Sequence, residues 1–168
     1  IPRLKNEKLL TELGLTGKFI FGFIGTMGMA HKLDFIIKSA RKINDRSIHF
    51  LLIGSGAEKK NLESMILEEQ LRNVTLHGLI DKNMVPEYLS IIDVALINLR
   101  RSETFKTVIP SKIFESAAMG KPILLGVDGE ARTLVENYSA GLFFEPEDEY
   151  DFLTKCKEVK SNKVLYGT

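Results

Sequence analysis

Short apolar runs alternate along the chain with stretches whose apolar residues recur every three or four positions. The runs at 19–24 and 48–53 are apolar without alternation, which is typical of strands buried on both faces. The stretch at 33–43 has a helical stripe of apolar residues instead. The pattern predicts six strands, at 19–24, 48–53, 74–77, 93–99, 122–125 and 141–144. It also predicts helices between them, at 33–43, 57–71, 84–91, 111–119 and 129–138, and a last helix at 151–159.

This alternation of strands and helices predicts a doubly wound, Rossmann-like α/β fold. Right-handed crossovers would place six strands in one mostly parallel sheet, with helices on both faces. In such sheets, ligands bind at the carboxyl ends of the strands, where the strand order reverses. The loops that directly follow the strands are therefore the candidates for a functional site.

Composition narrows the class of protein. A chain of 168 residues corresponds to one domain, and 44% hydrophobic with 27% charged residues excludes general disorder. The net charge of +1 gives no reason to expect a nucleic-acid partner. Cys156 is the single cysteine, which excludes an intrachain disulfide and a cysteine-rich metal site. Because the chain begins with Ile1 and not methionine, we expect it to be part of a longer protein.

Glycines mark the loops after the first two strands. Gly25 and Gly28 flank Thr26 in the first loop, and Gly54 opens the second. Glycines allow backbone amides to approach a phosphate closely, but they also serve simple tight turns. The dinucleotide spacing G-x-G-x-x-G is absent, so these loops alone leave both interpretations open.

The segment from Pro110 to Gly120 carries the most chemical information. Ser111 is expected to be the N-cap of a helix, with Lys112 in its first turn, where the helix dipole disfavours a cation. A bound phosphate would reverse that penalty. Glu115 falls on the same face and could accept two ribose hydroxyls. The alternative is an exposed ion pair between Lys112 and Glu115.

These residues resemble the C-terminal, donor-binding domain of the two-domain GT-B glycosyltransferases of family 4, the group 1 glycosyltransferases. The resemblance covers nearly the whole chain, and TVIPSKIFE is closest to a subgroup that acts in bacterial surface-polysaccharide assembly. It rests on the loop from Gly25 to Asp34 and on LLIGSGAEKKNLE, VTLHGLIDKNMVPEYLSIIDVALI, FESAAMGKPILLG, Gly129-Glu130 and AGLFFEP.

The resemblance implies roles for single residues. Glu115 matches the glutamate that binds the ribose, whereas the partner glutamate of the family motif is replaced by Thr107. Thr26 and His31 stand where the family often has an arginine and a lysine on the pyrophosphate. We infer that Lys112 supplies this charge, so Lys112 and Thr107 are the candidate catalytic residues.

The resemblance also implies a nucleotide-sugar site in which the backbone of one loop contacts the base of the nucleotide. Gly78, Leu79 and Ile80 match the segment that meets the base. The side chains of Leu79 and Ile80 could flank the base or belong to the core. Arg100 and Arg101 follow the fourth strand and could meet an acceptor phosphate or lipid headgroup, or remain solvated. The acidic run at 145–149 is expected to be a solvated loop.

The implied reaction is retaining transfer of a sugar from a nucleotide-diphosphate sugar, with UDP expected, to a glycan or lipid-linked acceptor. No cofactor and no essential metal are implied. The acceptor would bind mainly to an N-terminal domain, so the domain at 1–168 should turn over little alone.

A cytoplasmic location is implied, with peripheral association of the parent at the inner face of the plasma membrane. A non-catalytic nucleotide-binding or interaction module of the same fold is the alternative, with Thr107 as the sign of lost activity.

Overall fold

The computed structural model describes residues 2–162, and it places six parallel strands in one sheet. The strand order is β3-β2-β1-β4-β5-β6, and every neighbouring pair is parallel. The predicted doubly wound sheet is confirmed. The strands are β1 (Phe19–Thr26), β2 (Ile48–Ser55), β3 (Val74–His77), β4 (Val94–Asn98), β5 (Ile123–Gly126) and β6 (Gly141–Phe143).

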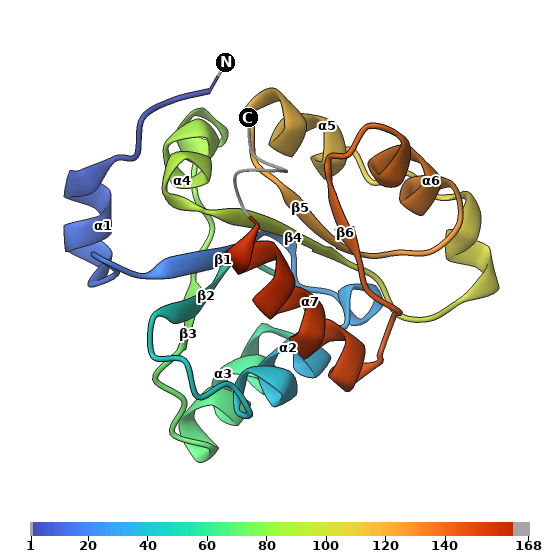
Figure 1. The fold of residues 1–168 in the computed structure, drawn as a ribbon. Helices are drawn as coiled ribbons and strands as arrows, with labels where there is room; N and C mark the ends of the chain where they lie inside the picture. The colour runs from blue at the N-terminus through green and yellow to red at the C-terminus, as the bar shows by residue number, and fades with distance from the viewer. Residues whose placement is uncertain (1, 163–168) are drawn as a thin grey trace.

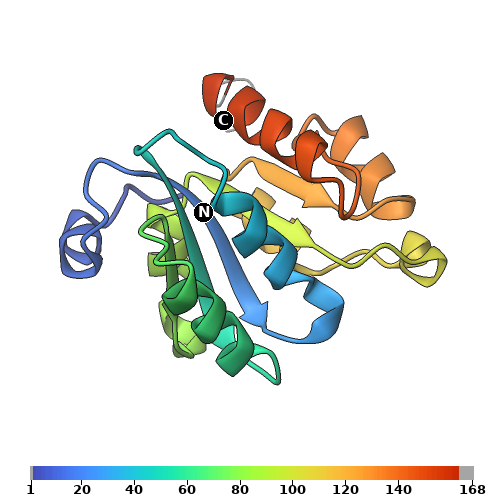
Figure 2. The same cartoon turned by 90° about the horizontal axis from the view of Figure 1, so that it is seen from below.

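Helices cover both faces of this sheet (Figures 1 and 2). One face packs against α2 (Leu33–Ala40), α3 (Lys59–Glu68) and α7 (Glu149–Ser161). The other packs against α1 (Glu7–Leu13), α4 (Val85–Ile91), α5 (Lys112–Ala118) and α6 (Glu130–Asn137).

Neighbouring residues of one strand serve opposite cores, which explains the uniformly apolar runs. Phe21 stacks on Phe50 at 5.3 Å between ring centroids in the core beneath α2 and α7. Ile20 and Leu51, each adjacent in sequence to one of these rings, belong to the core beneath α1 and α4. Both layers are therefore encoded in the same strands.

The apolar pattern did not predict α1. Only Leu9 and Leu10 of this helix are buried, which is too few for a recognisable stripe. Its signals are local: the Asn6 side chain accepts from the Leu9 amide at 3.0 Å, and Gly14 ends the helix in a left-handed conformation. Three short 3₁₀ helices were also not predicted: η1 (Met29–His31), η2 (Lys82–Met84) and η3 (Glu103–Thr107).

Other boundaries shift for local reasons. The predicted helix at 57–71 is shorter, since α3 spans Lys59–Glu68 and the following Gln70 has a left-handed backbone with φ of 51°. The last helix begins earlier than predicted, because the Asp148 side chain accepts from the Asp151 amide at 2.9 Å and so caps α7.

The sheet reverses its order between β1 and β4, where the pairing is shortest. These strands pair only at Phe21 with Val94 and Gly22 with Ala95, whereas β1 pairs with β2 along all eight of its residues. A Cβ on Gly22 would lie 2.2 Å from Ile92 Cδ1, so the chain needs a glycine for this close approach. Beyond Ala95 the two strands separate toward their carboxyl ends, where a doubly wound sheet has its binding crevice.

Asp93 holds the amino ends of these two strands together. Its carboxylate accepts the Ile20 amide at 2.8 Å, and its own amide donates to the Ile20 carbonyl at 2.8 Å. Lys5 forms an ion pair with the same carboxylate at 2.7 Å, and the Asp93 side chain is only 3% exposed. One buried carboxylate thus joins β1, β4 and the segment that precedes α1.

Asp93→Ala should lower the free energy of unfolding by about 2–3 kcal/mol, because the buried Ile20 amide loses its acceptor and Lys5 loses its counter-ion. Asp93→Asn keeps an oxygen acceptor and should cost about 1 kcal/mol. Urea denaturation of both variants measures the difference. If Asn were as damaging as Ala, the ion pair and not the hydrogen bond would dominate at this position.

Candidate functional site

The first two loops at the carboxyl edge pack directly on each other. Gly54 has φ of +145°, and a Cβ there would lie 1.8 Å from the Gly25 carbonyl oxygen. The Met27 amide donates to the Ser55 carbonyl at 2.9 Å across the same junction. Close packing of backbone on backbone therefore accounts for Gly54 without a ligand, and its role in nucleotide binding stays a prediction.

Gly28 differs, because its surroundings are open. It has an extended backbone before η1, and no protein atom lies within 4 Å of the position of a Cβ. Thr26, at the end of β1, is exposed. The packing of the described residues does not explain a glycine at position 28, which leaves room for a ligand to approach the backbone of this loop.

The segment after β3 places its two apolar side chains differently. Leu79 is 77% exposed, so the core interpretation is wrong for it, whereas Ile80 packs against the core beneath α4. His77 precedes them, hydrogen-bonded through Nδ1 to the Gly78 carbonyl at 2.9 Å and through Nε2 to the Tyr88 hydroxyl at 3.2 Å. His77 thus fixes the backbone of Gly78, and Leu79 remains free to contact a planar ligand.

Lys112 reaches from α5 across the crevice to the end of β1. Its Cε and Nζ lie 2.7 and 3.2 Å from the position of a Cβ on Gly25, so the ammonium group lies over the Gly25 backbone. A larger residue at position 25 would displace this side chain. The juxtaposition joins the loop after β1 to α5 at the point where the strand order reverses.

Lys112 and Glu115 are both unpaired. Within residues 2–162, neither side chain takes part in a hydrogen bond or an ion pair, so the proposed exposed ion pair between them is not formed there. Both line a narrow cavity of about 20 Å³ between α5 and the sheet, with room for about one water molecule. Glu115 is exposed beyond it. A nucleotide would therefore lie on the open edge of the sheet and not in a closed cavity.

The expected cap by Ser111 is wrong. Ser111 occupies the N-cap position of α5, but its side chain makes no capping hydrogen bond. Its backbone has φ of −60° and ψ of −24°, which is helical, whereas a side-chain cap requires an extended conformation. The chain already turns before α5, with the Ile113 amide donating to the Pro110 carbonyl at 3.1 Å. Lys112 is nevertheless the first residue of α5, as predicted.

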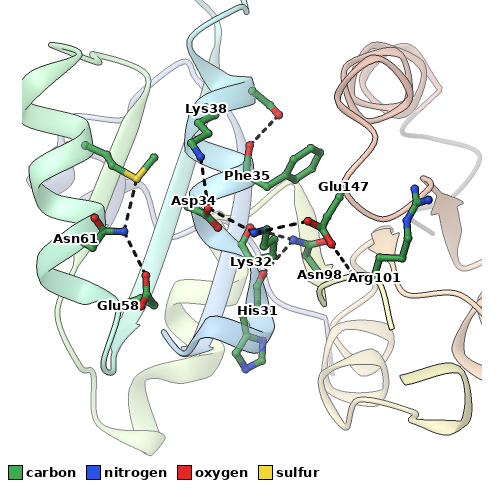
Figure 3. Close-up of polar contacts among 12 residues, drawn as sticks. His31, Lys32, Asp34, Phe35, Lys38, Glu58, Asn61, Asn98, Arg101 and Glu147 are labelled. Atoms are coloured by element: carbon green, nitrogen blue, oxygen red, sulfur yellow. Dashed lines mark hydrogen bonds and ion pairs between the residues drawn. The ribbon is translucent and has the colours of Figure 1, made fainter. Parts of the chain in front are cut away.

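The two basic residues of the first loop are engaged elsewhere (Figure 3). Lys32 lies between two carboxylates, 3.7 Å from Asp34 and 3.6 Å from Glu147. His31 packs edge-on against Phe23 at 5.4 Å between ring centroids. Burial lowers the pKa of His31, and the nearby positive charge of Lys112 lowers it further, while a hydrogen bond from the ring to the Asn98 backbone opposes the shift. His31 is thus neutral near pH 7, which leaves Lys112 as the cation over this loop.

Asn98 was not singled out from the sequence, although it fixes the first loop. Its Nδ2 donates to the carbonyls of His31 at 3.0 Å and Lys32 at 3.3 Å, and the residue is 1% exposed (Figure 3). A polar residue at the end of an apolar strand was the available signal. Its partners lie 66 and 67 positions earlier in the chain, so only the fold identifies them.

Thr107 ends η3, beyond the carboxyl end of β4 (yellow in Figure 2). Its hydroxyl donates to the Thr104 carbonyl at 3.4 Å, and the residue is exposed. The preceding Lys106 backbone lies against Gly129, where a Cβ would be 2.1 Å from the Lys106 carbonyl oxygen. Within residues 2–162 Thr107 forms no hydrogen bond with Lys112 or Glu115, and its catalytic role stays a prediction.

Arg101 is paired and not simply solvated. Its Nη2 donates to the Pro146 carbonyl at 2.8 Å and lies 3.7 Å from Glu145, while its amide donates to Glu147 at 2.9 Å. The acidic run at 145–149 is correspondingly engaged and is not a free loop. Arg100 is exposed and lies over the Phe105 ring at 5.7 Å. Both arginines line a cavity of about 230 Å³ beside η3.

Residues 2–162 hold no group of three or more histidine, cysteine, aspartate or glutamate side chains that could bind a metal ion. Over the same range, no helix combines the length and apolar character needed to span a bilayer. Cys156 is buried among apolar residues, which raises the pKa of its thiol.

The strand order and the helices on both faces of the sheet define a Rossmann-like domain with the fold found in GT-B glycosyltransferases. The family model described as glycosyl transferases group 1 matches residues 6–166. The chain belongs to this family.

The names of two curated relatives assign them to the biosynthesis of bacterial surface polysaccharides. TuaH of Bacillus subtilis (strain 168), whose name proposes a glycosyltransferase of teichuronic acid biosynthesis, is 29% identical over 142 residues. That match covers 83% of this chain and 34% of TuaH. WcaI of Escherichia coli (strain K12), named similarly for colanic acid biosynthesis, is 29% identical over 71% of this chain and 28% of its own length. The chain therefore spans about a third of the length of these relatives.

Solved structures share the fold at lower identity. Anabaena HepE, solved in complex with UDP, aligns with a TM-score of 0.82 and 19% identity over 96% of this chain and 44% of HepE. The C-terminal domain of the group 1 family protein LpcC from Francisella tularensis aligns with a TM-score of 0.74 and 16% identity. This alignment covers 99% of the present chain and 88% of the LpcC domain.

Proposed function

We propose that this chain is the donor-binding, C-terminal domain of a retaining glycosyltransferase that uses a UDP-sugar. The observation that carries the proposal is the Lys112 ammonium over Gly25, with the Glu115 carboxylate one helical turn away. Within residues 2–162, neither group forms a hydrogen bond or an ion pair. Together they provide a cation for a diphosphate and an acceptor for ribose hydroxyls at the reversal point of the sheet.

Each part of the donor then has a place in the proposed site. The diphosphate lies between Lys112 and the backbone of the loop from Gly25 to Gly28, with Thr26 beside it. Ser111 and Gly54 border the same region. The ribose meets Glu115, and the base lies against the segment from Gly78 to Ile80. The exposed Leu79 can cover one face of the base.

The proposed role of Lys112 in the reaction is electrostatic. When the bond between the sugar and the diphosphate breaks, negative charge grows on the leaving diphosphate while the acceptor oxygen forms the new bond. A cation placed beforehand stabilises that charge more strongly in the transition state than in the ground state. Thr107 is proposed to lie at the donor sugar, in place of the glutamate of the family motif.

The parent protein is proposed to transfer sugar to a glycan or lipid-linked acceptor in the cytoplasm, with peripheral attachment to the inner face of the plasma membrane. The names of TuaH and WcaI support an acceptor in surface-polysaccharide assembly. The acceptor would bind to an N-terminal domain, and the open donor edge described above agrees with a site that a second domain covers.

A non-catalytic nucleotide-binding module is the second candidate. Thr107 favours it, because a hydroxyl that donates to the Thr104 carbonyl cannot replace the charge of a carboxylate. Turnover of a UDP-sugar by the parent protein separates the two candidates, since a module would bind the nucleotide without consuming the sugar donor.

Glu115→Gln should weaken UDP binding at least about tenfold, because hydrogen bonds to a charged acceptor contribute roughly 1.5–3 kcal/mol each. The variant should keep its melting temperature, since Glu115 is exposed. Glu68→Gln is the matched control, because Glu68 is exposed at the far end of α3. Calorimetry that finds equal UDP affinity in Glu115→Gln and wild type would contradict the ribose role.

UDP should bind more tightly than GDP or ADP. This expectation rests on the resembling subgroup and on UDP in the related HepE structure, and not on a residue of this chain. A thermal-shift series with the three diphosphates measures it, since ligand at 100 times its dissociation constant stabilises by about 2.7 kcal/mol. A larger shift with GDP or ADP would reassign the base while leaving the diphosphate site intact.

Lys112→Ala should reduce the affinity for UDP far more than the affinity for uridine, because the ammonium group addresses only the phosphates. It should also lower kcat in the parent protein. Lys8→Ala, a change at an exposed lysine of α1, is the matched control. Calorimetry with both ligands decides: an equal loss for uridine and UDP, or no loss for UDP, would exclude the phosphate role.

A further inference from the structure

A larger cavity lies at the opposite end of the sheet from the donor site. It measures about 450 Å³ and opens at the amino ends of the neighbouring strands β1, β2 and β3. This volume falls in the range of small-molecule sites, whereas the enclosed space at Lys112 is about 20 Å³. The proposed donor function does not involve this end of the sheet.

A cation stands just before each of these three strands. Lys18 precedes β1, Arg46 lies two residues before β2, and Arg72 lies two residues before β3; all three line the cavity. Because the strands are parallel neighbours, three positions far apart in the sequence converge at one edge. We call Lys18, Arg46 and Arg72 the amino-end triad.

The positive charge of the triad is not neutralised by carboxylates. Arg46 and Arg72 form no ion pair within residues 2–162, and both are exposed. The Lys18 ammonium donates to the Arg46 carbonyl at 2.6 Å, which satisfies a donor without cancelling the charge. Asp45 is the acidic residue of the lining, and it is held by Lys160 at 2.6 Å and by the Ser47 hydroxyl at 2.6 Å.

The inner side of the cavity carries the neutral polar side chain of His49 beside apolar residues such as Ile43 and Leu71. His49 is 5% exposed, and its Nε2 hydrogen-bonds the Thr75 hydroxyl at 2.7 Å. Burial, together with the charge of Lys18, lowers the pKa of His49 to about 4, so the ring is neutral near pH 7. The cavity thus combines the three cations of the triad with the neutral His49 side chain. This combination suits an anion with an attached polar group.

Helix ends explain another cation of this cavity but not the triad. Arg41 is the C-cap of α2, where the helix dipole favours a cation, and it also pairs with Glu69 at 3.2 Å. Arg46 and Arg72 instead lie in the connections that lead into β2 and β3, several residues beyond the ends of α2 and α3. No carboxylate within residues 2–162 pairs with Arg46 or Arg72, so neither an ion pair nor a helix end accounts for their position at this cavity.

We propose that the amino-end triad binds a phosphate group, and that this cavity is a second anion site separate from the donor site. Arginine guanidinium groups match phosphate oxygens in a bidentate geometry, and two of them line the cavity together with Lys18. The phosphate belongs either to a small soluble anion or to the headgroup of an anionic lipid, since both present the same oxygens.

Isothermal calorimetry of the chain with pyrophosphate tests the first source. Because pyrophosphate can also enter the donor site, Arg46→Glu/Arg72→Glu is compared with Lys112→Ala. Binding that falls at least about tenfold in the first variant and persists in the second supports the proposal, since reversing two charges turns attraction into repulsion. Lys8→Glu/Lys38→Glu changes the net charge equally at exposed lysines away from the cavity, and should bind like wild type.

Flotation with vesicles of phosphatidylglycerol or of phosphatidylcholine tests the second source. Triad-dependent binding to phosphatidylglycerol alone supports the lipid headgroup. Arg46→Gln/Arg72→Gln serves as the second variant if the charge reversal impairs folding, and melting temperatures establish that each variant is folded. The proposal is overturned if neither probe binds, or if binding is unchanged by both pairs of arginine substitutions.

Discussion

The short pairing between β1 and β4 is the constraint on which the rest of the structure depends. Two residues of each strand pair, Asp93 holds their amino ends, and Gly22 lets Ile92 pack against β1. A longer pairing would close the crevice, because the strands would stay side by side to their carboxyl ends. The site exists because the sheet is joined firmly at one end of this junction and left open at the other.

The loops at the open end are held by close backbone packing, by side-chain hydrogen bonds to backbone carbonyls and by ion pairs. Gly54 meets the Gly25 carbonyl, and Asn98 holds the carbonyls of His31 and Lys32. Lys32 is kept between Asp34 and Glu147. Once these groups satisfy one another, Lys112 and Glu115 are left to face the crevice. A cation delivered from α5 in this way depends on how α5 sits against β4 and β5, and not on the conformation of the first loop.

The sequence predicted the sheet because uniformly apolar strands and striped helices are local signals. It also made Lys112 and Glu115 candidates for the site, because a cation at the start of a helix and a carboxylate three residues later are visible in the order of residues. It could not show that Lys112 lies over Gly25, since 87 positions separate the two residues. Only the folded sheet, in which β1 and β4 are parallel neighbours, brings them together. Ser111 illustrates the opposite error: the residue type favours a cap, but a turn from Pro110 sets a helical backbone and removes the need for one.

The two ends of the sheet handle charge by the same topological means. Parallel strands place all their carboxyl ends on one edge and all their amino ends on the other, so residues adjacent to strand ends gather without being close in sequence. At the carboxyl edge, Lys32 and Arg101 lie against carboxylates, whereas within residues 2–162 Lys112 and Arg100 form no ion pair. At the amino edge, the acid that lines the cavity is already paired, so Lys18, Arg46 and Arg72 keep their charge. A net charge of +1 for the whole chain therefore conceals a local group of cations at the amino edge of the sheet. Because exposed charges separated by more than about 10 Å are screened at ordinary ionic strength, each edge presents its own field to an anion.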